Sequence, residues 1–217
     1  MSPVRNMSLI GVSNGVTELV IATKNAGKLR ELKRYLRNAP AGAVSLDGFK
    51  HPPRIVENGK TFKANAEKKA VVTSRFTKGL VLADDSGLAV DALGGAPGIR
   101  SSRFAGPKKR DKDNNTKLLR LLERLPAGKR QAKFVCAIAI ADNGRVVKVI
   151  EECCKGRIAF AAKGRHGFGY DPLFLIPKYG KTFGELGLKT KDRMSHRSKA
   201  LKKAREFLKR YLKCSVA

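Results

Sequence analysis

The sequence predicts an α/β fold with a mixed β-sheet, and three kinds of segment indicate it. Short apolar runs rich in β-branched residues, at 17–23 and 79–87, are typical of buried strands. Segments with apolar residues at helical spacing alternate with them. Asn143 and Gly144 separate two further β-rich runs and predict a hairpin. Strands and helices in this mixture favour a single sheet that carries both kinds of strand pairing.

In the N-terminal half, the strand at 17–23 leads through a polar turn into a helix at 24–38. Leu29, Leu32 and Leu36 recur at helical spacing there and share one face. A strand, a short turn and a helix N-terminus together present backbone N–H groups to an anion. A second helix is expected at 61–76, with Thr61 as its cap.

In the C-terminal half, an amphipathic helix is expected at 115–125, closed by Pro126, and the hairpin at 132–160. The last helix, at 195–213, turns these residues inward: Ala200, Ala204, Phe207, Leu208 and Leu212. We find no repeat or linker, so residues 17–217 are predicted to form one domain. Residues 1–16 are predicted to be a flexible N-terminal extension.

Composition bounds the function. With 46 Lys+Arg against 18 Asp+Glu, the formal net charge of the 217 residues is +28, which attracts anions and favours nonspecific contact with nucleic acid. No zinc-finger, basic-zipper or aromatic RNA-binding signature accompanies the charge, so a solvated basic surface and a dedicated nucleic-acid site both stay open. The sequence contains no apolar run of about 18 residues, so no membrane span is predicted. The four cysteines lack zinc-like spacing and suit a reduced cytoplasm.

Carboxylates form the first group of candidate site residues. Asp84 and Asp85 follow a buried strand, and adjacent carboxylates near a core favour a cation such as Mg²⁺. The alternative is a pair of turn-forming residues that cap the strand end. Glu57, just before the second helix, is either a third carboxylate of this group or a solvated turn residue.

The turn "TKNAGK" at 23–28 is the second candidate, with Thr23, Asn25 and Lys28 around a strand-to-helix connection. It lacks the P-loop spacing, but small residues, exposed N–H groups, a lysine and the helix dipole are the ingredients of a phosphate site. A plain connection is the alternative. Lys69 on the second helix either contacts phosphate or lies on the surface.

The strings "FGYDP" at 168–172 and "SHR" at 195–197 form a third group. Phe168 is the better candidate for stacking on a flat ligand, whereas Tyr170 is either a second ring or part of the core. Asp171 binds a polar edge or braces the loop. His196 and Arg197, with Lys191 just upstream, offer hydrogen bonds to an oxygen-rich partner or a base edge. A packed turn and a surface helix cap are the alternatives.

Taken together, these strings resemble the inosine triphosphate pyrophosphatase family. The match runs through five blocks in the family's order: "IATKNAGKLREL", "ENGKTF" with the following "NA" and "KA", "LADDSGLAVDALGGAPGIRSSRFAG", "GFGYDPLF" and "SHRSKAL". Each block alone is weakly specific, but their conjunction is highly specific and covers nearly the whole chain.

The resemblance implies an elongated two-lobed α/β fold around a long mixed sheet flanked by helices, with a substrate cleft between the lobes. It implies a homodimer that uses Mg²⁺ to hydrolyse ITP, dITP and XTP to the monophosphate and pyrophosphate, and the cysteine usage adds the expectation of a cytoplasmic location. It also implies site roles: metal at Glu57, Asp84 and Asp85; catalysis by Asp85, Lys28 and Lys69; substrate at Thr23, Lys24, Asn25, Ala26, Gly27, Lys28, Ser86, Phe168, Gly169, Tyr170, Asp171, Lys191, His196 and Arg197.

Two positions depart from the family pattern. Ala64 stands where the family usually has an acidic residue, and His166 stands where glycine is common. The alternatives for function are a pyrophosphatase of another nucleoside triphosphate and a basic nucleic-acid-binding protein on the same fold. Intact acidic residues favour the enzyme.

Overall fold

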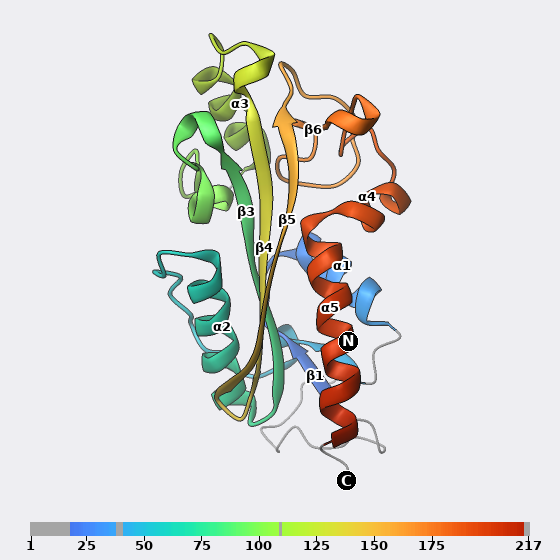
Figure 1. Ribbon diagram of the computed structural model, residues 1–217. Coiled ribbons are helices and arrows are strands. Elements are labelled where there is room, and N and C mark those ends of the chain that lie inside the picture. Colours follow the sequence, from blue (N-terminus) through green and yellow to red (C-terminus); the bar gives the residue numbers. More distant parts are fainter. Residues whose placement is uncertain (1–17, 38–40, 109, 215–217) are drawn as a thin grey trace. The chain divides into compact units, whose positions relative to one another are not determined.

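The computed structural model describes residues 18–37, 41–108 and 110–214 (Figure 1). The expected extension at 1–16, and Thr17 of the first predicted strand, lie outside these residues. Among the described residues, none of the helices combines the length and the apolar character that a membrane span requires. All four cysteines are free thiols, with Cys136 and Cys154 buried.

A seven-stranded mixed sheet in the order β2-β1-β3-β4-β5-β6-β7 forms the described fold. β1 pairs in parallel with both β2 and β3, whereas β6 pairs antiparallel with β5 and β7. The predicted α/β class and mixed sheet are therefore confirmed. The strands are β1 Glu18–Ile21, β2 Gly42–Ser45, β3 Leu80–Val90, β4 Gln131–Asp142, β5 Arg145–Ile158, β6 Phe174–Ile176 and β7 Lys181–Thr182.

The hairpin between β4 and β5 is confirmed at the predicted turn. Asn143 and Gly144 have φ values of 46° and 80°, which is the left-handed backbone that a two-residue hairpin turn with the twist of its strands requires. Asparagine and glycine adopt this conformation at low cost, so the dipeptide fixes both the turn and the register of the two long strands.

Five α-helices accompany the sheet in the part of the chain that the structure describes. They are α1 Ala26–Leu36, α2 Phe62–Thr77, α3 Asp111–Leu121, α4 Leu188–Met194 and α5 His196–Cys214. The caps of the first two agree with the sequence: the Asn25 side chain accepts from the Lys28 N–H at 2.9 Å, and the Thr61 hydroxyl accepts from the Ala64 N–H at 3.0 Å.

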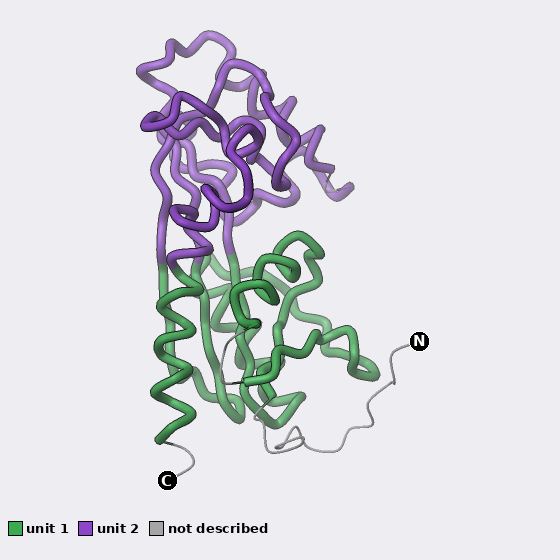
Figure 2. Tube along the Cα trace, turned by 90° about the vertical axis from the view of Figure 1, so that its right-hand side faces the viewer, with its two compact units in different colours: residues 1–85, 137–151, 200–217 green, residues 86–136, 152–199 purple. Residues whose placement is uncertain are grey.

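The chain divides into two compact units (Figure 2). Unit 1 comprises 1–85, 137–151 and 200–217, and unit 2 comprises 86–136 and 152–199. Each has its own core. In unit 1, Val20, Val81 and several alanines of α2 and β4 pack together. In unit 2, Leu118 of α3 packs with Phe174 and Phe183. In unit 1, α2 lies on one side of the strands and α1 and α5 lie on the other (Figure 1).

Two element boundaries and the buried face of α5 differ from the prediction. β3 does not stop at the carboxylates but continues to Val90, because the small and apolar residues 86–90 extend the buried pattern. α3 begins four residues earlier than predicted, at Asp111, since acidic residues in a first turn suit the helix dipole. In α5, Phe207 and Leu212 are only half-buried, whereas Leu201 joins the buried face.

Candidate active site

The turn between β1 and α1 places exposed residues at the N-terminus of α1 in unit 1. Thr23 is nearly buried, and its hydroxyl accepts from the Asn25 N–H at 3.3 Å, whereas Lys24, Asn25 and Ala26 are exposed. The first turn of α1 contains no acidic residue that would oppose an anion. Exposed residues and a helix N-terminus without acidic residues, which are features predicted for a phosphate site, thus lie together in this turn.

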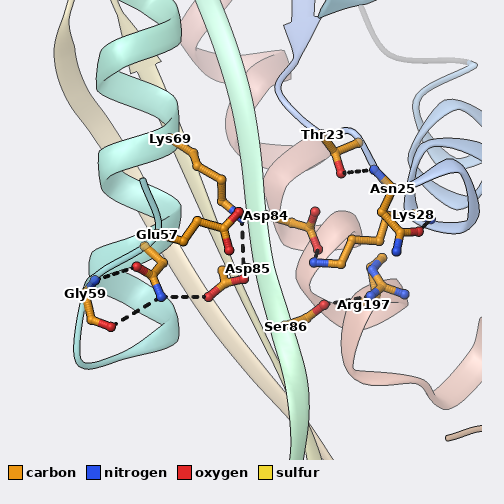
Figure 3. Close-up of polar contacts among 11 residues, drawn as sticks. Thr23, Asn25, Lys28, Glu57, Gly59, Lys69, Asp84, Asp85, Ser86 and Arg197 are labelled. Carbon is orange, nitrogen blue, oxygen red and sulfur yellow. Dashed lines mark hydrogen bonds and ion pairs between the residues drawn. The ribbon is translucent and has the colours of Figure 1, made fainter. Parts of the chain in front are cut away.

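Asp84 and Asp85 are consecutive residues of β3, so their side chains point to opposite faces of the strand (Figure 3). Asp84 faces α1, where its Oδ2 lies 3.0 Å from Lys28 Nζ. Asp85 faces α2, where its Oδ1 lies 3.4 Å from Lys69 Nζ. Each buried carboxylate therefore has a lysine of its own, which offsets the cost of burying its charge.

Lys69 is not a surface lysine. It is 8% exposed, and its ammonium lies 3.4 Å from both Glu57 Oε1 and Asp85 Oδ1 (Figure 3). Glu57, at 38% side-chain exposure, provides the open side of this group. The structure thus joins the loop before α2, the helix itself and the middle of β3 through one lysine.

Asn65 is a member of this group that the sequence reasoning missed. Its Nδ2 donates to Asp85 Oδ2 at 3.2 Å, and its Oδ1 accepts from the Gly59 N–H at 2.8 Å. A Cβ at Gly59 would lie 2.7 Å from Asn65 Oδ1, so glycine is required for this approach. Asn65 therefore fixes both the second oxygen of Asp85 and the loop that carries Glu57.

The electrostatics of the group follow from its burial. Burial raises the pKa of Asp85, and the like charges of Glu57 and Asp84 act in the same direction against the opposing pull of Lys69 and Lys28. Burial alone would lower the pKa of Lys69, but the attraction of Asp85, Asp84 and Glu57 outweighs it and raises that pKa. Lys69 is thus held as a cation beside a carboxyl group that binds a proton more readily than usual.

The fit to a metal ion can be judged from these donors. Among the described residues, no three histidine, cysteine or acidic side chains are grouped so as to hold a metal together. Glu57 and Asp85 do converge on one point, since both lie 3.4 Å from the same ammonium, whereas Asp84 lies on the opposite face of β3. These two carboxylates, which converge on the Lys69 ammonium, are hard oxygen donors of the kind that suits Mg²⁺. Mg²⁺ typically takes one or two carboxylates and completes its shell with phosphates and water.

Unit 2 contains the remaining predicted residues. Arg197 Nη2 donates to the Ser86 hydroxyl at 2.7 Å (Figure 3), and its guanidinium carbon lies 5.5 Å from the centroid of the Phe168 ring. Lys191 Nζ lies 5.1 Å from the same centroid. Two cations thus flank the half-buried ring of Phe168, in the manner of cation–π contacts.

Asp171 braces the loop in the structure. It is 2% exposed, and its Oδ2 accepts both from the Phe168 N–H at 2.8 Å and from Lys191 Nζ at 2.6 Å. A Cβ at Gly167 would come within 1.9 Å of that same oxygen, and Gly167 has a φ of 83°, so this position requires glycine.

The two rings of the "FGYDP" loop have different environments. Tyr170 is 4% exposed and belongs to the core of unit 2, where its hydroxyl donates to the Ser101 carbonyl at 2.8 Å. Of the two, Phe168 has the more exposed ring. His196 is 3% exposed and stacks on Phe134 at a centroid distance of 4.8 Å.

Ala64 and His166, the two positions that depart from the family pattern, each use the backbone N–H in a hydrogen bond. Ala64 lies half-buried in the first turn of α2, where its N–H is used by the Thr61 cap. His166 is exposed, and its N–H donates to the Gly184 carbonyl at 3.0 Å.

Comparison with known proteins finds similar sequences and similar structures. The model of the Ham1 family matches residues 19–207. Proteins named dITP/XTP pyrophosphatase from Desulforamulus reducens and Geobacillus kaustophilus are 52% and 50% identical, covering 89% and 87% of this chain and 96% and 93% of theirs. The Ham1 protein structures from Staphylococcus aureus and Coxiella burnetii superpose with TM-scores of 0.80 and 0.81, at 37% and 36% identity, covering 88% and 89% of this chain and 98% of each of theirs.

Proposed function

Because this chain belongs to the Ham1 family, we propose that it hydrolyses the noncanonical purine nucleoside triphosphates ITP, dITP and XTP to the monophosphate and pyrophosphate. The reaction removes these nucleotides from the pool that feeds nucleic-acid synthesis. The observation that carries the proposal is the buried pairing of Lys69 with Asp85 beside Glu57, because it unites the charges that phosphoryl transfer needs.

In this proposal the phosphate chain is held by the turn from Thr23 to Lys28. Its exposed residues, its helix N-terminus and the Lys28 ammonium all favour negative charge. Lys28 and Lys69 share the charge of the departing pyrophosphate, which lowers the cost of breaking the anhydride bond.

Glu57 and Asp85 would hold Mg²⁺, with Asp84 on the other face of β3 keeping Lys28 in place. When bound, the ion would polarise the phosphoryl oxygens and offset their charge. Lys69, which the structure holds as a cation between the two carboxylates, is suited to contact the phosphate oxygens.

Asp85 also orients the attacking water and accepts its proton. Water attacks the α-phosphorus, a new P–O bond forms, and the bond to the bridging oxygen breaks so that pyrophosphate leaves with that oxygen. The raised pKa of Asp85 supports this role, since a stronger base takes the proton more readily near neutral pH. Asn65 holds the carboxylate in position through Oδ2.

The residues of unit 2 are proposed to recognise the nucleoside. Phe168 stacks on the purine, while Lys191, His196, Arg197, Ser86 and Gly169 surround the base and ribose. Tyr170 and Asp171 hold this loop from the buried side. A 6-oxo group is an acceptor where adenine has a donor, so donors at this position favour the oxo form. A site that leaves adenine's amino group facing donors can discriminate strongly.

The bond that is cleaved can be tested with labelled water. Hydrolysis of dITP in H₂¹⁸O should place the label in the nucleoside monophosphate and leave the pyrophosphate unlabelled. Label found in the pyrophosphate would mean attack at the β-phosphorus and would contradict the proposed mechanism.

The proposal also includes a homodimer, as the family resemblance implies, in the cytoplasm. Free thiols at all four cysteines are compatible with a reducing compartment. Light scattering of the purified chain checks the assembly: a mass near twice 23.7 kDa is expected, and a mass of one chain would contradict it.

A second candidate function, nucleic-acid binding, is favoured by one feature of α5. Lys202, Lys203, Lys209, Arg210 and Lys213 are all exposed along this helix. Such a function predicts binding to DNA or RNA that weakens steeply with salt, without pyrophosphate release. Pyrophosphate release from dITP that persists in the presence of excess duplex DNA would favour the enzyme.

A further inference from the structure

The loop of Phe168 to Asp171 is held not only by Asp171 but also by α3, a helix that carries none of the predicted site residues. Asp111 Oδ2 accepts from the Gly169 N–H at 2.7 Å. Asn115 Nδ2 donates to the Gly169 carbonyl at 3.1 Å. Both polar groups of a single residue are therefore fixed by one face of one helix, because residues four apart lie one turn above each other.

Gly169 is a residue whose own backbone preferences do not select the conformation that it has here. Gly169 has a φ of 63°, and nothing lies within 4 Å of where its Cβ would be. Glycine populates many other backbone states at similar cost, so its neighbours alone do not keep it in this one. The bonds from Asp111 and Asn115 supply that restriction.

The rest of the loop is anchored on either side of this residue. Asp171 accepts from the Phe168 N–H at 2.8 Å, and the Tyr170 hydroxyl donates to the Ser101 carbonyl at 2.8 Å. Asp111 also lies close enough to Tyr170 that, after burial, its charge is the second cause of the raised pKa of that phenol. Gly169, directly after Phe168, is thus the point where the loop depends on α3.

Helix α3 is itself well fixed, so it can serve as a support. Leu118 and Leu122 are fully buried in the core of unit 2 together with Tyr170. Asn114, on the first turns of α3, accepts from the Ala105 N–H at 2.7 Å and donates to the Ser102 carbonyl at 3.3 Å. The support for Gly169 is therefore built on a rigid element.

We propose that Asp111 and Asn115 are positioning residues for nucleoside recognition, which set the Phe168 ring by fixing the Gly169 peptide. The inference rests on the proposed function, because it assigns Phe168 to the purine. Without the Asp111 bond the Phe168–Gly169 peptide can rotate, and without the Asn115 bond the Gly169–Tyr170 peptide can rotate. In either case the ring loses its fixed orientation between Lys191 and Arg197. Purine binding and discrimination then suffer, while the phosphate-handling residues of unit 1 keep their contacts.

Two isosteric substitutions test the direction of each hydrogen bond. Asp111→Asn keeps an acceptor oxygen for the Gly169 N–H, whereas Asn115→Asp replaces the donor to the Gly169 carbonyl by a repelling oxygen. We expect Asn115→Asp and Asp111→Ala to raise KM for dITP about tenfold and to reduce the preference for dITP over dATP, with kcat changed less than threefold. Asp111→Asn should recover most of the loss seen in Asp111→Ala.

Asp113→Asn is the matched control, because Asp113 lies in the same first turn but accepts from Arg110 Nε, at 2.7 Å, on the helix surface. Thermal unfolding identifies any variant that is merely destabilised. Hydrogen exchange supplies a readout independent of activity: the Gly169 amide should exchange faster in Asp111→Ala and Asn115→Asp than in the wild type or in Asp113→Asn.

The outcomes separate this inference from the function itself. A wild-type chain that releases no pyrophosphate from dITP would contradict the proposed function. An active wild type whose KM, preference and Gly169 exchange are unchanged by Asn115→Asp would overturn the positioning role alone. Equal losses in Asp111→Asn and Asp111→Ala would also overturn it, since they would trace the effect to the charge of Asp111 rather than to its acceptor oxygen.

Discussion

At the scale of single residues, the active-site proposal depends on how two neighbouring carboxylates are kept charged inside a sheet. β3 turns Asp84 toward Lys28 and Asp85 toward Lys69, so each carboxylate has its own cation on its own face of the strand. Glu57 and Asn65 complete the surroundings of Asp85 only. The two aspartates are therefore unequal, and Asp85 is the one suited to act on water.

Replacing Asp85 by asparagine tests that assignment. The amide is nearly isosteric and still accepts hydrogen bonds. It cannot take a proton from water, and it lacks the negative charge with which a carboxylate holds a metal ion. We expect pyrophosphate release to fall by about a thousandfold with an unchanged circular dichroism spectrum. Asp47→Asn, at an exposed site of unit 1, is the control. Full activity in Asp85→Asn would refute its role as base and metal ligand.

Replacing Lys69 by methionine tests the electrostatic part of the account. The stem is retained, but Asp85 and Glu57 lose their shared cation, so we expect the free energy of unfolding in urea to fall by about 3 kcal/mol and activity to be lost. Lys68→Met is the matched control, since the neighbouring Lys68 donates to the Asn58 side chain at an exposed site. Equal stability of the two variants would contradict the buried pairing.

Sequence reasoning located Asp85 and Lys69 but could not tell that Lys69 is buried. A lysine on a helix is usually solvated, and no apolar stripe of large residues marks the inner face of α2. A usable signal was present: Asn65 and Lys69 share a face with Ala66, Ala70 and Thr73, all of which are buried. Polar residues among small ones on one helix face are candidates for contacts across to a neighbouring strand.

At the scale of elements, α3 supports the loop that carries Phe168, and a buried arginine holds the end of that helix. Arg130 is 2% exposed, and its guanidinium donates to four carbonyls: Leu122 at 2.6 Å, Ile158 at 2.8 Å, Ala159 at 2.9 Å and Leu125 at 3.5 Å. Burial lowers its pKa. The arginine thereby joins the residues after α3 to the end of β5.

Replacing Arg130 by lysine tests this join. The lysine ammonium cannot reach all the carbonyls that the planar guanidinium of Arg130 contacts. Some of these buried carbonyls would therefore lose their hydrogen-bond donor. We expect the variant to lose about 2–4 kcal/mol of stability, with faster hydrogen exchange at residues 122–125 and 158–159. Lys129→Met, at the exposed neighbour, should change neither. Unchanged exchange in Arg130→Lys would show that the helix end is held by other contacts.

Element boundaries were where sequence reasoning failed, for reasons specific to each element. β3 was expected to end at Asp84 and Asp85 because charged residues usually stop a buried strand, but lysines on both faces allow it to continue. The start of α3 was missed because Asp111 looks like a loop residue until its contact with Gly169 is known. The hairpin was found because the Asn143-Gly144 turn needs no partner to be recognised.

At the scale of the whole molecule, the net charge of +28 far exceeds what catalysis at one site needs. A positive field raises the local concentration of an anionic substrate, and salt screens it. We expect KM for dITP to rise severalfold between 50 mM and 500 mM KCl while kcat stays nearly constant. A KM that does not depend on salt would show that the excess charge plays no part in substrate capture.

The central claim is the class of nucleotide that the chain hydrolyses, and a substrate panel tests it most directly. Pyrophosphate and orthophosphate release should be measured with Mg²⁺ for ITP, dITP, XTP, GTP and ATP at matched concentrations. The account predicts pyrophosphate as the product, with kcat/KM for ITP, dITP and XTP at least a hundredfold above that for ATP. Equal rates on ATP, or orthophosphate as the product, would contradict it.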